Sequence, residues 1–260
     1  MISVKEIAAA LNERCPFDWQ EDFDNSGLQV GDLSAPCRRI LLALDCTAAV
    51  VREAIDGCYD LIVSHHPLLF AGLKQISATD GKGRLIYPLI EHKIALLSLH
   101  TNLDKAPYGV SAALAARLGL QNCTIWQDED GHGLGVRGEL PQAQSLGALA
   151  ATVRERLQRP QLKYCGDPTR TVRSVALLGG SGAGYIEQAI AEGIDVYISG
   201  DFKYHDGQRA AEADLCLIDG GHYHTEIWVL EPLQALLQEL FTEQIEVKIS
   251  EQRSNFWSYV

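Results

Sequence analysis

Five side chains of the types that bind metal ions stand in short, well-spaced motifs. They are His65, His66, Asp104, His222 and Glu226. Neutral imidazole is the commonest protein ligand for transition metals, and carboxylates add hard oxygen ligands. His222 and Glu226 are four residues apart, so they share one face if this segment is helical. These residues predict a site for divalent cations.

The number of these side chains predicts two ions, not one. Adjacent residues on a regular strand point to opposite faces, so His65 and His66 require either a twisted backbone near Pro67 or one ion each. Three histidines and two carboxylates exceed what a four-coordinate ion with an open position takes from protein. A dinuclear centre, with ions roughly 3.5–4 Å apart and Glu226 as the bridging ligand, fits the count. Mixed nitrogen and oxygen ligands suit zinc, iron, manganese or nickel.

Other polar segments leave alternatives open. His100 is a sixth ligand, a group that orients Asp104, or a general acid or base. The glycine-rich stretch 179–184 either binds phosphate through backbone N–H groups or forms a simple tight turn. The segment 24–31 is a pocket loop or a capping turn. We expect the segment 199–205, which contains Asp201, Lys203 and His205, to line the cleft that holds the metal ligands. We expect His224 at the surface or the pocket rim.

The elements that must position these residues alternate between strand and helix. In the first half, apolar runs predict strands at 39–45, 61–63 and 94–99, with helical spacing at 48–56 and 83–92. In the second half we expect strands at 175–178, 195–198 and 215–218 and a helix at 185–192. Such alternation predicts an α/β fold with largely parallel sheets covered on both faces. His65, His100 and His222 follow strand ends, where α/β sheets bind ligands.

The two halves of the sequence resemble each other. Ala54-Ile55, Asp60 and Ser64 recur 135 positions later as Ala189-Ile190, Asp195 and Ser199. A histidine with an acid four residues on follows in both halves. Either a duplication or chance explains this, since few residue types suit buried strands. A duplication predicts two similar lobes that face each other, with ligands from both.

The middle of the chain, residues 128–158, does not continue the regular alternation of strands and helices. The polar, glycine-rich stretch 128–135 predicts a surface loop, 136–140 an edge strand, and 145–158 a helix with an apolar face. This stretch is the natural boundary between the lobes.

Bulk properties limit the classes of partner. The 260 residues are 47% hydrophobic and 22% charged, with a net charge of -12. Non-specific nucleic-acid binding and attachment to an anionic membrane both require excess positive charge, so we expect neither. The charged N-terminus is not a signal peptide, and no apolar run would span a membrane. Seven scattered cysteines without a C-x-x-C pair indicate free thiols, hence the cytoplasm.

Three motifs in combination resemble the NIF-three-like family, whose bacterial members are commonly labelled GTP cyclohydrolase 1 type 2 homologues. These motifs are Ser64–Phe70, His100–Asp104 and Gly221–Glu226, and the segments 24–31 and 199–201 also fit. The resemblance implies the same five metal ligands and a dinuclear centre in a cleft between two interlocked α/β lobes. It implies a first lobe of residues 1–125 completed by 222–260, a second lobe of 126–221, and a toroidal homohexamer built as a trimer of dimers.

Two functions follow as hypotheses. The first is a metal-dependent hydrolase that acts on a nucleotide or a phosphorylated small molecule, because two ions can activate water and clamp a phosphate or purine substrate. The alternative is a non-catalytic metal-binding ring protein with a regulatory or protein-interaction role. An open coordination position beside a phosphate-sized pocket would favour the hydrolase.

Overall fold

The computed structural model describes residues 1–126 and 131–260 and contains a mixed α/β fold with two sheets. Contacts divide the chain into two compact units. Unit 1 comprises Met1–Ala106 and Leu230–Asn255, and unit 2 comprises Pro107–Val229 and Phe256–Val260. The domain boundaries expected after residues 125 and 221 stay a prediction. Among the described residues, no helix has both the length and the apolar character needed to cross a bilayer.

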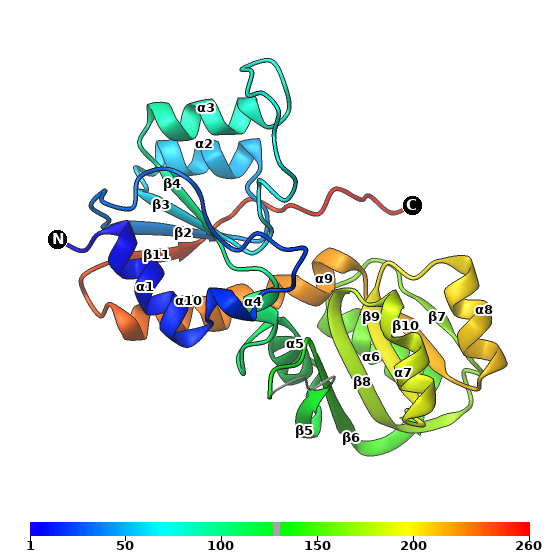
Figure 1. Ribbon diagram of the computed structural model, residues 1–260. Helices are drawn as coiled ribbons and strands as arrows, with labels where there is room; N and C mark the ends of the chain where they lie inside the picture. The colour runs from blue at the N-terminus through cyan, green and yellow to red at the C-terminus, as the bar shows by residue number, and fades with distance from the viewer. Residues whose placement is uncertain (127–130) are drawn as a thin grey trace. The chain divides into compact units, whose positions relative to one another are not determined.

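Unit 1 is built on a five-stranded sheet in the order β1-β4-β3-β2-β11 (Figure 1). The strands are β1 (Gly27–Val30), β2 (Arg39–Ala43), β3 (Leu61–Ser64), β4 (Ala95–Ser98) and β11 (Glu246–Ile249). Strands β11, β2, β3 and β4 run parallel, and β1 is antiparallel to β4. The carboxyl ends of β2, β3 and β4 therefore meet at one edge of the sheet.

Helices cover both faces of this sheet, which explains why its central strands are continuous apolar runs. Helices α2 (Ala48–Asp56) and α3 (Gly83–Glu91) lie side by side on one face (Figure 1), where Val50 and Leu89 pack with Leu41 and Leu96. Helices α1 (Val4–Arg14) and α10 (Leu230–Leu240) lie on the other face. The short elements η1 (Phe17–Trp19) and α4 (Thr101–Asp104) complete the unit.

Unit 2 is built on a six-stranded sheet in the order β5-β6-β8-β9-β10-β7. The strands are β5 (Gln121–Trp126), β6 (Gly135–Ser145), β7 (Lys163–Cys165), β8 (Thr171–Ser181), β9 (Val196–Gly200) and β10 (Cys216–Asp219). Strand β9 pairs in parallel with β8 and with β10, and the other neighbouring strands of this sheet pair antiparallel. The segment 136–140 is not an edge strand, because β5 pairs with the outer side of β6. The loop expected at 128–135 lies partly outside the described residues.

The helices of unit 2 also cover two faces. They are α5 (Val110–Leu118), α6 (Leu146–Arg156), α7 (Ile186–Ala191), α8 (Tyr204–Glu212) and α9 (His222–Glu226), with η2 (Ala183–Tyr185) and η3 (Ile227–Val229). Helices α5 and α6 pack with Val196 and Ile198 of β9, whereas α7 and α8 pack with the intervening Tyr197. Successive strand residues point to opposite faces, so the two pairs of helices lie on opposite sides of the sheet.

The repeat seen in the sequence extends to hydrogen bonds. Asp60 Oδ2 accepts the backbone N–H groups of residues 38 and 39 at 2.7 and 3.0 Å. Asp195 Oδ2 accepts those of residues 173 and 174 at 2.9 and 2.8 Å. In each unit this aspartate, located just before one strand, thus holds the chain at the neighbouring parallel strand. Each unit contains the repeated helix–strand segment.

The match of the two histidine–acid pairs is displaced by one residue. Ser64 pairs with Ser98, and Ser199 pairs with Asp219. Counting on from these partners, Gly221 and not His222 stands where His100 stands in unit 1. The difference arises because His100 caps α4 from outside, whereas His222 is the first residue of α9.

Candidate metal centre

His65 and His66 follow the end of β3, where pairing with the chain after β2 continues. The N–H groups of His65 and His66 donate to the carbonyls of Ala43 and Leu44 at 3.1 and 2.9 Å. The backbone is irregular enough that both rings lie close together, with centroids 4.9 Å apart. Both alternatives for this pair, a twisted backbone with one shared ion and one ion each, stay predictions.

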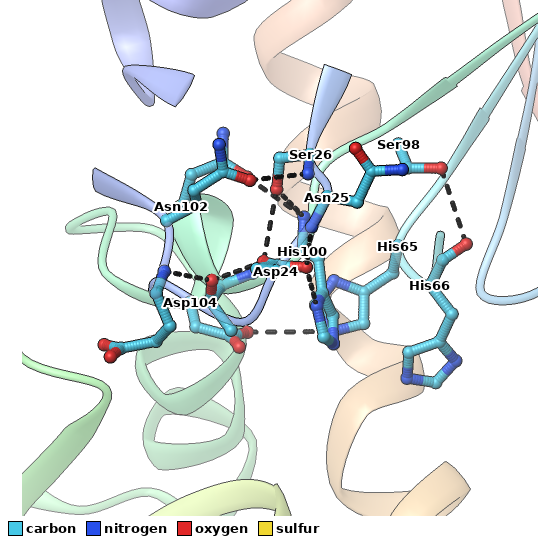
Figure 2. A network of polar contacts seen from close by, with 12 residues as sticks. Asp24, Asn25, Ser26, His65, His66, Ser98, His100, Asn102 and Asp104 are labelled. Carbon is cyan, nitrogen blue, oxygen red and sulfur yellow. Dashed lines mark hydrogen bonds and ion pairs between the residues drawn. The ribbon is translucent and has the colours of Figure 1, made fainter. Parts of the chain in front are cut away.

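His100 joins this pair from the end of β4. The possible ligand atoms of His65, His66 and His100 all lie within 4.8 Å of one another. The ring centroid of His100 is 5.2 Å from that of His65 and 5.6 Å from that of His66. Figure 2 shows these histidines with Asp104 among the surrounding polar groups. Of the alternatives open for His100, the structure favours a place among the ligands.

The Nδ1 atoms of these three histidines each have an acceptor. His65 Nδ1 lies 2.9 Å from the carbonyl oxygen of Leu99, which can only accept. His66 Nδ1 lies 2.8 Å from Asp45 Oδ1, and His100 Nδ1 lies 2.7 Å from Asp24 Oδ1. Each Nδ1 therefore carries the proton, and the lone pair is on Nε2. This tautomer is the one in which imidazole binds a metal ion through Nε2.

Asp24 holds more than the His100 ring. Its side chain has no exposed surface, and its second oxygen accepts the N–H of Thr101 at 2.9 Å together with the Thr101 hydroxyl. It thus caps α4, the short helix that ends in Asp104. Burial alone would raise the pKa of Asp24, but the hydrogen bonds from His100 and Thr101 outweigh burial and hold that pKa well below its ordinary value. The first residues of the segment 24–31 therefore support the site, whereas Gly27–Val30 form β1.

Asp104 is the carboxylate of unit 1. Its Oδ1 lies 3.7 Å from His65 Nε2. This distance exceeds that of a hydrogen bond, but two donors that bind one ion at about 2.1 Å are separated by roughly 3–4 Å. The chemistry and spacing of the donor set of unit 1 therefore fit a divalent metal ion.

The remaining predicted ligands belong to unit 2. His222 and Glu226 lie on one face of α9, with His222 Nε2 at 3.2 Å from Glu226 Oε2. Glu226 is buried, being 5% exposed. His222 Nδ1 lies 2.8 Å from Asp201 Oδ2, so this histidine also presents Nε2. The 3.2 Å separation of His222 Nε2 and Glu226 Oε2 also fits two donors that bind one ion.

Glycine-rich segments make room for these two side chains. Gly180 has φ +73°, and a Cβ there would lie 2.2 Å from Glu226 Oε1 and 3.5 Å from His222 Nε2. The N–H of Gly179 donates to Ser111 Oγ, and that of Gly180 donates to Thr225 Oγ1. These two amides are therefore not available to a phosphate, and residues 179–181 continue β8. Gly180 thus allows close approach to the two ligands, and for residues 182–184 phosphate binding and a tight turn both stay predictions.

His224 lies away from the His222–Glu226 face, as its spacing predicts. Its Nδ1 lies 3.0 Å from the carbonyl oxygen of Leu157, and the residue is partly exposed. Asp219, at the end of β10, accepts the N–H of Gly221 at 2.9 Å and that of Phe202 at 3.2 Å. It thereby holds the chain on both sides of the His222–Asp201 pair.

Sequence reasoning missed most of the residues that support the ligands. Asp45 and Asp219 were not singled out, and Asp24 and Asp201 appeared only within candidate pocket segments. The usable signal was position, since Asp45, Asp201 and Asp219 each stand at or just after the end of a parallel strand. Lys203 and His205 belong to the α8 end of the same segment, where His205 contacts Gln208, so they do not join His222.

Comparisons with known proteins agree with the motifs. The model of the Duf34/NIF3 (NGG1p interacting factor 3) family matches residues 2–255. A Clostridium acetobutylicum protein described as GTP cyclohydrolase 1 type 2 homolog is 35% identical over 229 residues, which are 86% of this chain and 85% of that protein.

Solved structures are similar along the whole chain. A Staphylococcus aureus hypothetical protein, SA1388, aligns with a TM-score of 0.95 at 32% identity over 99% of both chains. A Bacillus cereus protein described as related to NIF3 aligns with a TM-score of 0.94 at 26% identity, covering 100% of this chain and 99% of the other.

Proposed function

The chain belongs to the Duf34/NIF3 family, and from this premise we propose that it is a metal-dependent hydrolase acting on a nucleotide or a phosphorylated small molecule. The observation that carries the proposal is the shared orientation of the histidines. Each of His65, His66, His100 and His222 has its Nδ1 beside an acceptor, so each presents Nε2 as a donor. His224 Nδ1 also lies beside an acceptor, so these bonds support a metal site only because the donors also lie close together, those of His65, His66 and His100 within 4.8 Å of one another.

We propose that the ligands of both units join in one dinuclear centre. Unit 2 by itself offers an incomplete set, because it supplies one nitrogen donor, His222, and one carboxylate, Glu226. An ion held by these alone would keep several positions open. Glu226, with one oxygen beside His222 and the other beside Gly180, is the proposed bridging ligand. The proposed ligands are His65, His66, Asp104, His222 and Glu226, with His100 as a sixth.

Two bound ions would supply an activated water and would stabilise the negative charge that develops during hydrolysis on phosphate oxygens or on the ring nitrogen bonded to an attacked ring carbon. The protein's own contribution is to fix the donors. Asp24, Asp45 and Asp201 hold three imidazoles by their Nδ1 atoms, and Gly180 leaves room for the Glu226 carboxylate. The name of the Clostridium relative points to a purine nucleotide as the substrate to test first.

The experiment compares wild-type protein with Glu226→Gln and, as a matched control, Glu212→Gln in the exposed part of α8. Metal content is measured by elemental analysis, and turnover is measured with GTP and a panel of phosphoesters. We expect about two ions per wild-type chain, and for Glu226→Gln a loss of metal and of turnover by at least about tenfold. Glu212→Gln should match wild type. Equal turnover by all three proteins, or none by any, would exclude a hydrolase for these substrates and favour a non-catalytic role.

We further propose a homohexamer, a trimer of dimers, in the cytoplasm. The assembly rests on the family resemblance, and the location rests on the seven cysteines, which are free thiols. Native mass spectrometry tests the assembly, and a purely monomeric or dimeric protein would contradict it.

A further inference from the structure

Two exposed aromatic rings lie beside the histidine cluster of unit 1. Phe23 is 63% exposed and Phe70 is 49% exposed. Their ring centroids are 6.3 Å apart, and the Phe70 ring meets the His100 ring at 5.9 Å and 87°. Single exposed apolar residues are common, but a contiguous pair that touches a candidate metal ligand marks a binding surface.

The geometry of the pair determines how a ligand could use it. The two ring planes are tilted by 56° at a centroid distance of 6.3 Å. A flat ring inserted between them would need parallel planes about 7–8 Å apart, twice the optimal carbon–carbon contact. The phenylalanines therefore form one bent wall, against which a flat ring can stack from outside. Phe offers no hydrogen bond, so this wall would select for aromatic faces and not for particular ring substituents.

The backbone beside Phe70 is held in place by the segment 24–31, whose Asp24 supports His100. Asn25 Nδ2 donates to the carbonyl of Leu69 at 2.7 Å, and the N–H of Leu69 donates to Gln29 Oε1 at 3.1 Å. Gln29 Nε2 in turn donates to the carbonyl of Asn25 at 2.7 Å. The backbone next to Phe70 is thus clamped from both sides by the segment whose Asp24 holds His100. Ring wall and donor nitrogens therefore share one support.

We propose that Phe23 and Phe70 bind the heteroaromatic ring of a small-molecule ligand and that Asn25 and Gln29 are positioning residues for this wall. The inference rests on the proposed function, because the ring belongs to the substrate whose reacting group meets the metal ions. The contact of Phe70 with His100 argues for this occupant. A ring stacked on this wall is separated from the donor nitrogen of His100 only by Phe70. A protein partner has no need to come so close to the metal ligands.

The test measures binding and not turnover. Metal-loaded protein is dialysed against guanosine monophosphate and against ribose 5-phosphate, two probes that differ only by the base. The variants are Phe70→Ala and Phe23→Ala, and the control is Tyr87→Ala, which removes an exposed ring from α3 of the same unit. We expect wild type to prefer the nucleotide, and each Phe variant to weaken nucleotide binding about five- to a hundredfold while ribose 5-phosphate binding is unchanged. Tyr87→Ala should behave as wild type.

Asn25→Ala tests the positioning role. We expect it to lower the ratio of nucleotide to ribose 5-phosphate affinity while metal content stays at the wild-type level. A merely structural role would lower the melting temperature and leave that ratio unchanged.

Three results would overturn the inference. They are a wild-type protein without preference for the nucleotide, Phe variants that weaken both probes equally, and a Phe variant that dissociates the assembly, which would make the wall a subunit contact. Failure of the proposed function looks different, because ring preference would then persist without metal-dependent turnover. Turnover without ring preference would support the proposed hydrolase function and contradict the ring-binding role of Phe23 and Phe70.

Discussion

Three of the histidines have a carboxylate oxygen within hydrogen-bond distance of Nδ1. Asp45, Asp24 and Asp201 lie at 2.7–2.8 Å from Nδ1 of His66, His100 and His222, whereas His65 uses a backbone carbonyl. A carboxylate both orients an imidazole and raises its basicity, and a carbonyl chiefly orients it. The donors are therefore unequal, and we expect His65 to be the weakest nitrogen ligand.

Asp24→Asn tests this support. The amide oxygen of asparagine can still accept from His100 Nδ1, but the negative charge is lost and the α4 cap is weakened. We expect the affinity for zinc to fall about ten- to a hundredfold, measured by competition with a chromogenic chelator. Asp32→Asn is the control, because Asp32 only caps a turn at Ser34. Unchanged affinity in Asp24→Asn would contradict a supporting role.

The candidate ligands could be predicted from sequence, but their supporting residues could not. Histidine and glutamate at strand ends are informative because few other roles bring them there together. An aspartate in a turn is common, and the distance along the chain gives no clue, since 21 residues separate Asp45 from His66 and 76 separate Asp24 from His100. Only the folded sheet brings these residues together.

Among the predicted elements, most strands and helices follow the predicted ranges closely, although β8, predicted at 175–178, covers Thr171–Ser181, and the sequence patterns predict neither α5 nor α10. Helix α2 covers 48–56 as predicted, and β3 extends the predicted strand by one residue. The errors fall where burial is one-sided. Strand β5 is exposed at most positions, so it lacks an apolar run, and its omission made β6 seem an edge. The glycines at 179–181 suggested a turn because spacing cannot reveal the neighbouring Glu226.

At the scale of elements, Asp195 fastens β9 to the start of β8. Burial alone would raise its pKa, but hydrogen bonds from Ser174 and Arg173 outweigh burial, so the pKa of Asp195 is lowered. A lowered folded-state pKa stabilises the protein above the unfolded-state value of about 3.9, and this stabilisation is lost as the pH falls through the folded-state pKa.

We therefore expect Asp195→Ala to lower the free energy of unfolding by about 1–3 kcal/mol at pH 7, because the N–H groups of Arg173 and Ser174 lose a charged acceptor. The difference from wild type should shrink in acid, as urea denaturation at pH 7 and near pH 3 would measure. Glu187→Ala, which removes an exposed ion pair with Arg209, should cost little at either pH. A difference for Asp195→Ala that grows in acid would contradict the assignment.

For the whole molecule, the proposed ligands divide between units that each have their own sheet and core. Bound ions would then couple the unfolding of the two units. We expect the metal-loaded protein to unfold in one calorimetric transition, and the chelated protein to unfold at lower temperature in two. His92→Ala, an exposed histidine distant from the donor set, should leave both traces unchanged. If chelation lowers only one of two transitions, one unit holds the ions alone.

The repeat in the sequence predicts two α/β segments, and both are present, because the same buried strands and the same aspartate recur. The order in which the chain visits the two units is harder to predict from local sequence patterns. Helix α10 and β11 complete unit 1 although more than a hundred residues of unit 2 precede them, and no local pattern shows that β11 pairs beside β2.

This return of the chain sets an order of events during synthesis. Residues 107–229 leave the ribosome as an uninterrupted stretch, so the six-stranded sheet can close while translation continues. The other sheet must wait, because β2 stays an open edge until β11 emerges. An uncovered β2 can pair with another chain. The first unit to be translated is therefore the last to be finished, and nascent-chain aggregation would begin at β2.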